Sequence, residues 1–319
     1  MSEIKNDFII VGAGLTGLAL NRELCHFAPE AHHLIIEKSK ACGGRMATRR
    51  ISDMKFDHGA QFLKKTEASE SLLKFWQQCG VLNFFPQRGP DSYFGTDGMT
   101  QLAKKLAERA SVQYNSKIVR IKRADREWIS YNEKGDGYKS KNIVLTCPLP
   151  QSLEILSHSS ISFESSLNDI KYSKALVVLV ELESEILGGV EYLEMNDREI
   201  FSITSQFSKG LSKSPAYVVV MSDLWSEEFF DLNENVILEK TNQILKSYFS
   251  EYQFKQGQVK KWRYSRPVAT FKNLFYRVEE GLYLAGDAFG GASLNGALRS
   301  AYALFDHLAK SNLLKRSHL

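Results

Sequence analysis

Apolar and polar positions alternate in short runs along the chain, and the first run predicts a strand followed by a helix. Residues Asp7–Val11 form an apolar stretch rich in isoleucine and valine, as expected for a buried strand. Beyond a glycine-rich turn, Leu20, Leu24 and Phe27 recur at the spacing of one helix face. A second apolar run, His33–Ile36, predicts another strand. The chain therefore opens with a strand–helix–strand unit of about 30 residues.

The pattern continues with helices and short strands up to residue 147. We expect helices over Ser69–Gln78 and Thr96–Ala110, and Thr96 or Asp97 can cap the second helix. Three short strands joined by turns are predicted at Lys117–Ile121, Glu127–Asn132 and Lys139–Thr146. This mixture of helices and strands is typical of an α/β protein.

Beyond Pro148 the pattern predicts a region rich in strands and then a return to strand and helix. The elements expected in the middle region are strands at Ala175–Leu182, Tyr217–Met221 and Gln258–Tyr264 and a helix at Asn235–Phe249. The last part is predicted to contain a strand, a glycine-rich turn and a helix, at Gly281–Ala285, Gly286–Gly291 and Asn295–Lys310.

This order predicts two domains, with the second inserted into the first. A Rossmann-type nucleotide-binding domain is expected to comprise residues 1–60, 96–150 and 272–319. A smaller α+β domain, expected to hold the substrate, comprises residues 61–95 and 151–271.

Composition narrows the class of protein. The 319 residues are 43% hydrophobic and 24% charged, which is typical of globular proteins and excludes a disordered or collagen-like chain. A net charge of +4 gives no indication of nucleic-acid binding. Four widely spaced cysteines without a CxxC pair indicate a reducing cytoplasm and no structural metal. No apolar run approaches the roughly 18 residues of a membrane span, so no membrane contact is expected.

The glycines of the first turn carry the first chemical signal. Gly12, Gly14 and Gly17, with Ala13, Leu15 and Thr16 between them, fit the dinucleotide fingerprint between a strand and a helix. The helix N-terminus offers free N–H groups to phosphates. Glu37, 20 residues beyond Gly17 and followed by Lys38, ends the next strand, where its carboxylate can accept both ribose hydroxyls. The sequence therefore predicts a bound dinucleotide.

Two later segments favour a flavin dinucleotide over NAD. Gly44, Arg45 and Met46 follow the acidic residue closely, where an NAD dehydrogenase has no evident use for them. Asp287, after Gly286 at a strand end, can accept hydrogen bonds from ribityl hydroxyls. A helix begins at Asn295, Gly296 and Ala297, and its N-terminus can face the flavin ring. We therefore expect FAD, bound non-covalently because no cysteine stands at an evident attachment site.

At these residues the chain resembles the FAD-dependent amine oxidase superfamily and, within it, the renalase group. The matching segments are Gly12–Gly17, Glu37, Gly43–Thr48, Phe56–Gln61, Gly98-Met99, Lys261–Ser265 and Gly286-Asp287. The resemblance implies the two-domain fold of p-hydroxybenzoate hydroxylase, with Arg45 near the FAD phosphates and a backbone contact from Val119 to the adenine. It places His58, Gly59, Ala60 and Gln61 beside the flavin ring and Trp262 in the substrate cavity.

The chemistry follows from what the chain lacks. The sequence lacks a second glycine fingerprint and so gives no sign of a nicotinamide reductase site. Electrons should therefore enter from the substrate and leave to oxygen or another acceptor. The candidate substrate pocket comprises Gln61, Trp225, Trp262 and Tyr264, and no catalytic acid or base is identified. A dihydronicotinamide gives up a hydride without losing a proton. Together with the absence of a catalytic base, the resemblance to the renalase group implies an oxidase that passes hydride from misreduced NAD(P)H isomers to flavin N5, and this is the favoured hypothesis.

Two alternatives stay open, an oxidase of a small amine and a flavin-binding module without turnover. The basic run around Trp262, which includes Lys260 and Arg266, is interpreted as a solvated strand face or as an attraction for a phosphorylated substrate. We expect a small-molecule substrate and oxygen as partners, and the sequence does not predict an oligomeric state.

Overall fold

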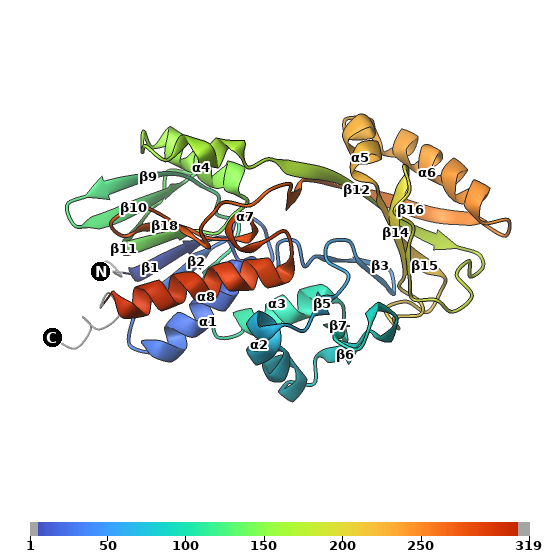
Figure 1. Cartoon of the computed structure of the whole chain (residues 1–319), viewed down its shortest axis with the longest axis horizontal. Helices are drawn as coiled ribbons and strands as arrows, with labels where there is room; N and C mark the ends of the chain where they lie inside the picture. Colours follow the sequence, from blue (N-terminus) through green and yellow to red (C-terminus); the bar gives the residue numbers. More distant parts are fainter. Residues whose placement is uncertain (1–5, 312–319) are drawn as a thin grey trace.

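The computed structural model describes residues 6–311, in which two sheets are connected by long strands (Figure 1). The larger sheet has eight strands, in the order β17-β18-β11-β1-β2-β8, with β10 paired to β11 and β9 paired to β10. These strands are β1 (Asn6–Val11), β2 (His33–Ile36), β8 (Val112–Gln113), β9 (Ile118–Ala124), β10 (Glu127–Asn132), β11 (Gly137–Leu145), β17 (Tyr276–Glu279) and β18 (Leu282–Leu284). The pairs from β18 through β11, β1 and β2 to β8 are parallel, whereas β17 pairs antiparallel with β18, β10 with β11 and β9 with β10.

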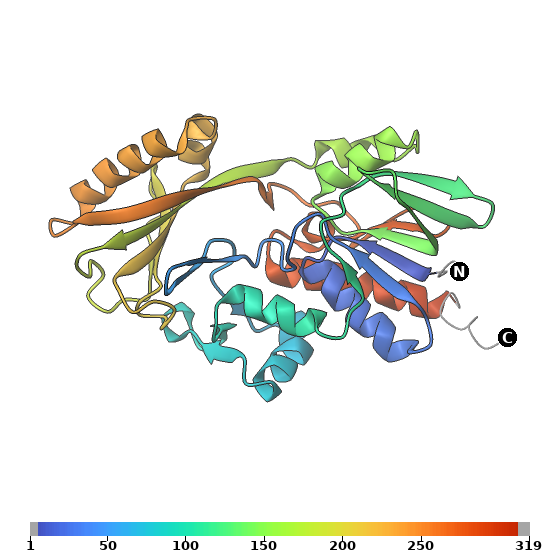
Figure 2. The same ribbon diagram turned by 180° about the vertical axis from the view of Figure 1, so that it is seen from behind.

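Helices cover both faces of this sheet, as its continuous apolar strands require. Phe8 and Ile10 of β1 pack into one hydrophobic core, whereas Ile9 and Val11 pack into another on the opposite face. The first core includes side chains from α1 (Leu15–Phe27), α3 (Met99–Ala107) and α8 (Leu294–Lys310), and the second includes α4 (Leu149–His158). Figures 1 and 2 show these helices on the two sides. This arrangement is a Rossmann-like α/β unit.

The smaller sheet is antiparallel, in the order β13-β14-β15-β12-β16. Its strands are β12 (Tyr172–Leu182), β13 (Tyr192–Glu194), β14 (Ile200–Ser205), β15 (Ala216–Met221) and β16 (Phe254–Pro267). Helices α5 (Asp223–Phe229) and α6 (Glu234–Tyr248) cover one face. The hairpin of β3 (Thr48–Ile51) and β4 (Met54–Asp57) packs on the other face, where Phe56 contacts the core around Val177. This hairpin connects the two units.

The segment between the hairpin and α3 packs with the nucleotide-binding unit. It contains β5 (Leu63–Lys64), α2 (Glu67–Gln78), β6 (Leu82–Phe84), a 3₁₀ turn (Pro86–Arg88) and β7 (Ser92–Gly95). Leu72 and Trp76 are fully buried in the same core as Phe8. The hydrophobic core therefore groups residues 61–95 with the first unit, whereas the sequence assigned them to the substrate domain. A second 3₁₀ turn (Ser165–Asp169) and the four-residue helix α7 (Asp287–Gly290) complete the elements.

One predicted helix is wrong at both ends. The helix expected over Thr96–Ala110 runs only from Met99 to Ala107, and Gly98, with φ of 88°, precedes it. Asp97 cannot cap it, because its carboxylate forms ion pairs with Arg50 and Lys55 of the hairpin. The other predicted helices and strands are present with ends within about four residues, whereas several elements, among them β14, α4, α5 and the hairpin, were not predicted. Within residues 6–311, no helix has the length and apolarity needed to cross a membrane.

Candidate functional site

The glycine-rich turn after β1 has the geometry of a phosphate-binding loop. Gly12 has φ of 114°, and a Cβ added at Gly17 would lie 2.2 Å from the Gly12 carbonyl oxygen, so neither position accepts a side chain without strain. A Cβ added at Gly14 would meet nothing within 4 Å, and no side chain caps α1. The start of this 13-residue helix therefore has no side-chain cap and has space beside Gly14, which suits an anion.

Glu37 lies beside this loop at the end of β2. The residue is 8% exposed, and its carboxylate accepts 2.8 Å hydrogen bonds from the backbone N–H groups of Ala13 and Ser39. Each carboxylate oxygen retains capacity for a further donor, such as a ribose hydroxyl. Lys38 points elsewhere, toward Gln151. Val119 is the extra residue of a β-bulge between β9 and β10. At such a position the backbone groups are left without partners in the hydrogen bonding between the strands.

The segment from Gly43 to Met46 continues the site away from Glu37. The Gly43 N–H donates to the Ala13 carbonyl oxygen at 2.8 Å, and a Cβ at Gly44 would lie 3.5 Å from the Gly14 backbone. The Met46 side chain is buried in the core, and its carbonyl oxygen accepts a hydrogen bond from Thr100. This segment therefore offers backbone and the Arg45 side chain to a ligand.

Arg45 and Asp287, 242 residues apart, form a two-pronged ion pair. Nη1 of Arg45 lies 2.5 Å from Oδ2 of Asp287, and Nη2 lies 2.8 Å from Oδ1. The hydroxyl of Tyr172 donates to the same carboxylate at 3.0 Å, and its ring lies beneath the guanidinium. Burial, and next the charge of Asp287, raise the pKa of Tyr172, which therefore remains a donor. Nη1 of Arg45 also donates to the Ser265 carbonyl oxygen, so this cluster joins both units.

The Asp57–Gln61 loop packs directly against this segment. The Ala60 N–H donates to the Arg45 carbonyl oxygen at 2.8 Å, and a Cβ at Gly59 would lie 2.0 Å from that oxygen. The Trp262 indole N–H donates to the His58 carbonyl oxygen at 2.8 Å, and the two rings stack with centroids 5.4 Å apart. In the described chain, Nδ1 of His58 and Oε1 of Gln61 are buried without a hydrogen-bond partner. A ligand bound beside this loop could supply these two atoms with partners.

The surroundings of His58 keep its imidazole neutral. Burial, followed by the charges of Lys260 and Arg49, lowers the pKa of His58 to about 4, against the opposing effect of Asp57. The imidazole therefore carries no charge near neutral pH.

This pKa gives the FAD-free protein a defined sensitivity to acid. Between pH 6.5 and about 4 the unfolded chain binds a proton at His58 that the folded chain does not, so stability falls as the pH falls through this window. The loss amounts to about 3 kcal/mol of unfolding free energy. Urea titrations at several pH values measure the free energy of unfolding. We expect His58→Gln to remove the loss of stability that comes from His58, whereas His26→Gln, at an exposed position, leaves the loss unchanged. An equal loss in His58→Gln would contradict the assignment.

The start of α8 lies next to the start of α1. Thr16 donates its hydroxyl to the Ala297 carbonyl oxygen at 3.3 Å. The Gly296 N–H is capped by the Ser293 hydroxyl, and a Cβ at Gly296 would lie 1.9 Å from the Gly291 carbonyl oxygen. The Asn295 side chain is engaged with Lys64 and Thr66. Any ligand contact from Asn295 would therefore come from its backbone.

The four residues that the sequence analysis assigned to the substrate pocket do not all lie on one side of the smaller sheet. Trp262 lies on the hairpin side of the smaller sheet, and Tyr264 follows it with its ring edge-on to Tyr172 at 6.0 Å. Trp225 is only 6% exposed and packs against Phe229 on the opposite, helix-covered face. Trp225 is therefore a core residue, and its assignment to the substrate pocket is wrong.

Several residues of the site were missed from the sequence. Tyr172 lies three residues before the predicted strand at Ala175, and extending that strand backward would have included it. Arg49 lies in the β3–β4 hairpin, for which no strands were predicted. Lys209 and Gln206, which contact the Asp57–Gln61 loop from a turn of the smaller sheet, carry no local signal.

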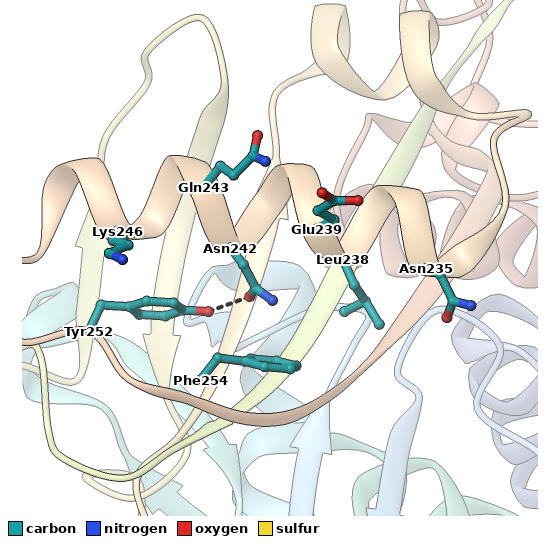
Figure 3. A pocket seen from close by; sticks show the side chains of 8 residues that line it. All are labelled: Asn235, Leu238, Glu239, Asn242, Gln243, Lys246, Tyr252 and Phe254. Atoms are coloured by element: carbon teal, nitrogen blue, oxygen red, sulfur yellow. Dashed lines mark hydrogen bonds between the residues drawn. The ribbon is translucent and has the colours of Figure 1, made fainter.

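A surface groove lies elsewhere on the molecule. It is formed by α6 and the start of β16, and Tyr252 contacts Asn242 within it (Figure 3). This groove belongs to the outer, helix-covered side of the smaller sheet, so it does not include Arg45, His58 or Trp262.

The residues of the site fit an FAD molecule. The open space at Gly14 and the uncapped start of α1 suit the pyrophosphate, and Glu37 suits the ribose. The unpartnered atoms of His58 and Gln61 lie farther along, where a long ligand would continue. A dinucleotide that ended near Arg45 would leave these two atoms without partners.

Replacement of Glu37 tests the ribose contact. We expect Glu37→Ala to weaken FAD binding by about 1–3 kcal/mol, because the N–H groups of Ala13 and Ser39 and the ribose hydroxyls lose their acceptor. Titration calorimetry with FAD measures the change, and Glu30→Ala, at an exposed position nearby, serves as the control. Unchanged affinity in Glu37→Ala would mean that the ribose is held elsewhere.

Comparisons with known proteins agree with this geometry. A family model described as flavin containing amine oxidoreductase matches residues 81–303, and a model of an NAD(P)-binding Rossmann-like domain matches residues 10–79. The fold is similar to the crystal structure of "Putative protoporphyrinogen oxidase" from Exiguobacterium sp. 255-15, with a TM-score of 0.77 and 14% identity over 98% of this chain and 99% of that one. It is also similar to a putrescine oxidase triple mutant with redesigned cofactor binding, with a TM-score of 0.76 and 12% identity over 96% and 99%.

Proposed function

The chain belongs to the flavin-containing amine oxidoreductases, so it is an FAD-dependent oxidoreductase, and we propose that it oxidises a dihydronicotinamide dinucleotide. The substrate would be a misreduced 2- or 6-dihydro isomer of NAD(P), which would place the chain in the renalase-like group with a p-hydroxybenzoate hydroxylase-like arrangement of its two units. We further propose that molecular oxygen is the electron acceptor and the cytoplasm the location.

The observation that carries this proposal is a pair of cations next to the stacked rings of His58 and Trp262. Lys260 precedes Trp262 by two residues on β16 and shares its sheet face, and Arg49 on the hairpin is close enough to lower the pKa of Lys260, after burial. Within residues 6–311, neither cation has an ion-pair partner within 4 Å, and the charge of Glu234, which raises the pKa of Lys260, has a smaller effect on it than burial and Arg49. Two such cations attract the phosphates of a dinucleotide and repel a protonated amine.

The remaining side chains suit a reaction without proton abstraction. FAD supplies, when bound, the acceptor for a hydride. The Trp262 ring is held in one orientation by its bond to the His58 carbonyl oxygen and offers a flat surface to a nicotinamide ring. His58 stays neutral near pH 7, so it adds no charge beside the pyridinium product. The overall reaction, dihydronicotinamide + O₂ + H⁺ giving nicotinamide cation + H₂O₂, is balanced.

Anaerobic mixing of the FAD-loaded protein with candidate substrates tests the proposal. We expect the 6-dihydro isomer of NAD to bleach the flavin absorbance within seconds, roughly 100-fold faster than 4-dihydro NADH or putrescine, since only a hydride positioned toward the ring is transferred. Oxygen should then restore the colour and yield hydrogen peroxide. Dithionite bleaching provides the control that the bound flavin is reducible.

Two outcomes would contradict the proposal. Fast bleaching by putrescine with none by the dihydro isomers would identify an oxidase of small amines. Bleaching by dithionite alone would indicate a flavin-binding module without turnover on any of these substrates.

A further inference from the structure

A single ammonium group joins the two ends of the Asp57–Gln61 loop. Nζ of Lys209 lies 2.9 Å from Oδ2 of Asp57, the first residue of the loop, and donates to the carbonyl oxygen of Gln61, the last residue, at 3.0 Å. The two bonds hold the ends of a five-residue segment and leave His58, Gly59 and Ala60 between them. The loop is therefore closed by a side chain that belongs to neither of its flanking elements.

This ion pair is completely buried. The side chains of Asp57 and Lys209 are both 0% exposed, and the ammonium lies 4.7 Å from the centre of the Phe94 ring and 5.5 Å from that of Phe85. The other carboxylate oxygen accepts hydrogen bonds from the Thr48 hydroxyl and the Met99 N–H. Each charged group thus has at least two hydrogen-bond partners besides or including its counter-ion, as a buried pair requires if it is not to destabilise the fold strongly.

Lys209 comes from the smaller sheet. It lies in the turn between β14 and β15, and the same turn makes two more contacts with the hairpin segment. Oε1 of Gln206 accepts the Asp57 N–H at 3.1 Å, and the Leu211 carbonyl oxygen accepts the Lys55 N–H at 2.9 Å. The turn therefore fixes the loop from the substrate side, while Arg45 and Ala47 accept its N–H groups from the nucleotide side.

We propose that Lys209 is a positioning residue, through which the smaller sheet sets the orientation of His58 and Gln61 toward the flavin. The two buried atoms that lack a partner, Nδ1 of His58 and Oε1 of Gln61, belong to the loop that Lys209 closes. The Trp262 indole is attached to the same loop through the His58 carbonyl oxygen. This role does not depend on the substrate proposed above.

The test requires a variant that folds. Lys209→Met alone leaves the Asp57 carboxylate buried and unpaired, which can unfold the protein. The Lys209→Met/Asp57→Asn double variant removes both charges and keeps acceptors for Thr48 and Met99. The matched control is Lys255→Met/Glu181→Gln, which removes another ion pair of the smaller sheet, 2.8 Å long, that does not touch the loop.

Two measurements on the proteins distinguish positioning from simple packing. Hydrogen–deuterium exchange of the FAD-free proteins should be at least about tenfold faster for the amides of residues 58–60 in the Lys209 double variant, and unchanged there in the control. With FAD added to saturation, the visible flavin spectrum should be shifted in the Lys209 double variant only. Unchanged exchange of the loop would overturn the proposal, and so would faster exchange with an unaltered flavin spectrum. Neither measurement uses a substrate, so failure here is separate from failure of the proposed function.

Discussion

An Asp287→Ala protein is expected to fold but to bind FAD about 100-fold more weakly than the unaltered protein, corresponding to about 3 kcal/mol. The substitution removes the acceptor shared by both Arg45 amino groups and the Tyr172 hydroxyl. Arg45 then loses its fixed position beside the site, and the flavin loses any bond to the carboxylate. Flavin content of the purified protein and calorimetric titration with FAD measure the effect, and circular dichroism checks folding.

The Tyr172→Phe variant is the matched comparison. It removes one hydrogen bond to Asp287 and keeps the ion pair and the ring beneath Arg45, so we expect about 3- to 10-fold weaker binding. Full flavin content in Asp287→Ala would show that the Arg45–Asp287 pair is only a structural link between the two units.

Charge reversal at Arg49 and Lys260 should distinguish between a dinucleotide and an amine as the substrate. With the Arg49→Glu/Lys260→Glu double variant we expect KM for the 6-dihydro isomer of NAD to rise about 100-fold at low salt, with kcat nearly unchanged, because two attractions to phosphate become repulsions. Added salt should raise KM in the unaltered protein and lower it in the variant. Steady-state peroxide production at several ionic strengths measures both effects.

The control for this experiment changes the net charge equally at a distant place. Lys122→Glu/Arg126→Glu alters exposed residues of the β9–β10 hairpin, at the far end of the larger sheet (Figure 1). We expect KM within about twofold of the unaltered protein, since these charges are screened at that separation. An equal rise of KM in both double variants would show that the effect comes from net charge, and it would contradict the proposed contact with phosphate.

Patterns among neighbouring residues predicted those parts of the fold that interactions between neighbouring residues determine. The apolar run of β1 and the glycines after it identify the strand, turn and helix, because each residue there is constrained by its immediate neighbours. Glu37 could be placed at a strand end in the same way, and the structure puts it against Ala13. Thr96 and Asp97 were wrong as helix caps because distant partners from the hairpin hold Asp97.

Other features depend on contacts that no local pattern reveals. The four residues from Phe207 to Gly210 have the composition of an exposed turn, yet Lys209 is fully buried because Asp57 lies opposite. Trp225 lies in α5 and Trp262 in β16, and the sequence around them does not show which face of the smaller sheet each covers. Only the packing of α5 shows that the two side chains lie on opposite faces. Lys209 pairs with Asp57 and Trp262 with His58 across 152 and 204 residues, so distant contacts decided these two positions.

The antiparallel pair of β12 and β16 has a mechanical consequence. The two strands are hydrogen-bonded from Tyr172 and Pro267, beside Arg45 and Asp287, to Leu182 and Phe254 at the far end of the smaller sheet. A hinge needs a few residues whose backbone angles can change freely, and a continuous ladder restrains them along most of this length. Along this ladder the pairing is irregular between Ser173 and Ala175 and between Glu181 and Leu182, and only the first of these lies near Arg45 and Asp287. We therefore expect the two units to move as one body, so that side chains at the entrance, rather than an opening of the domains, set the rate at which small molecules enter and leave.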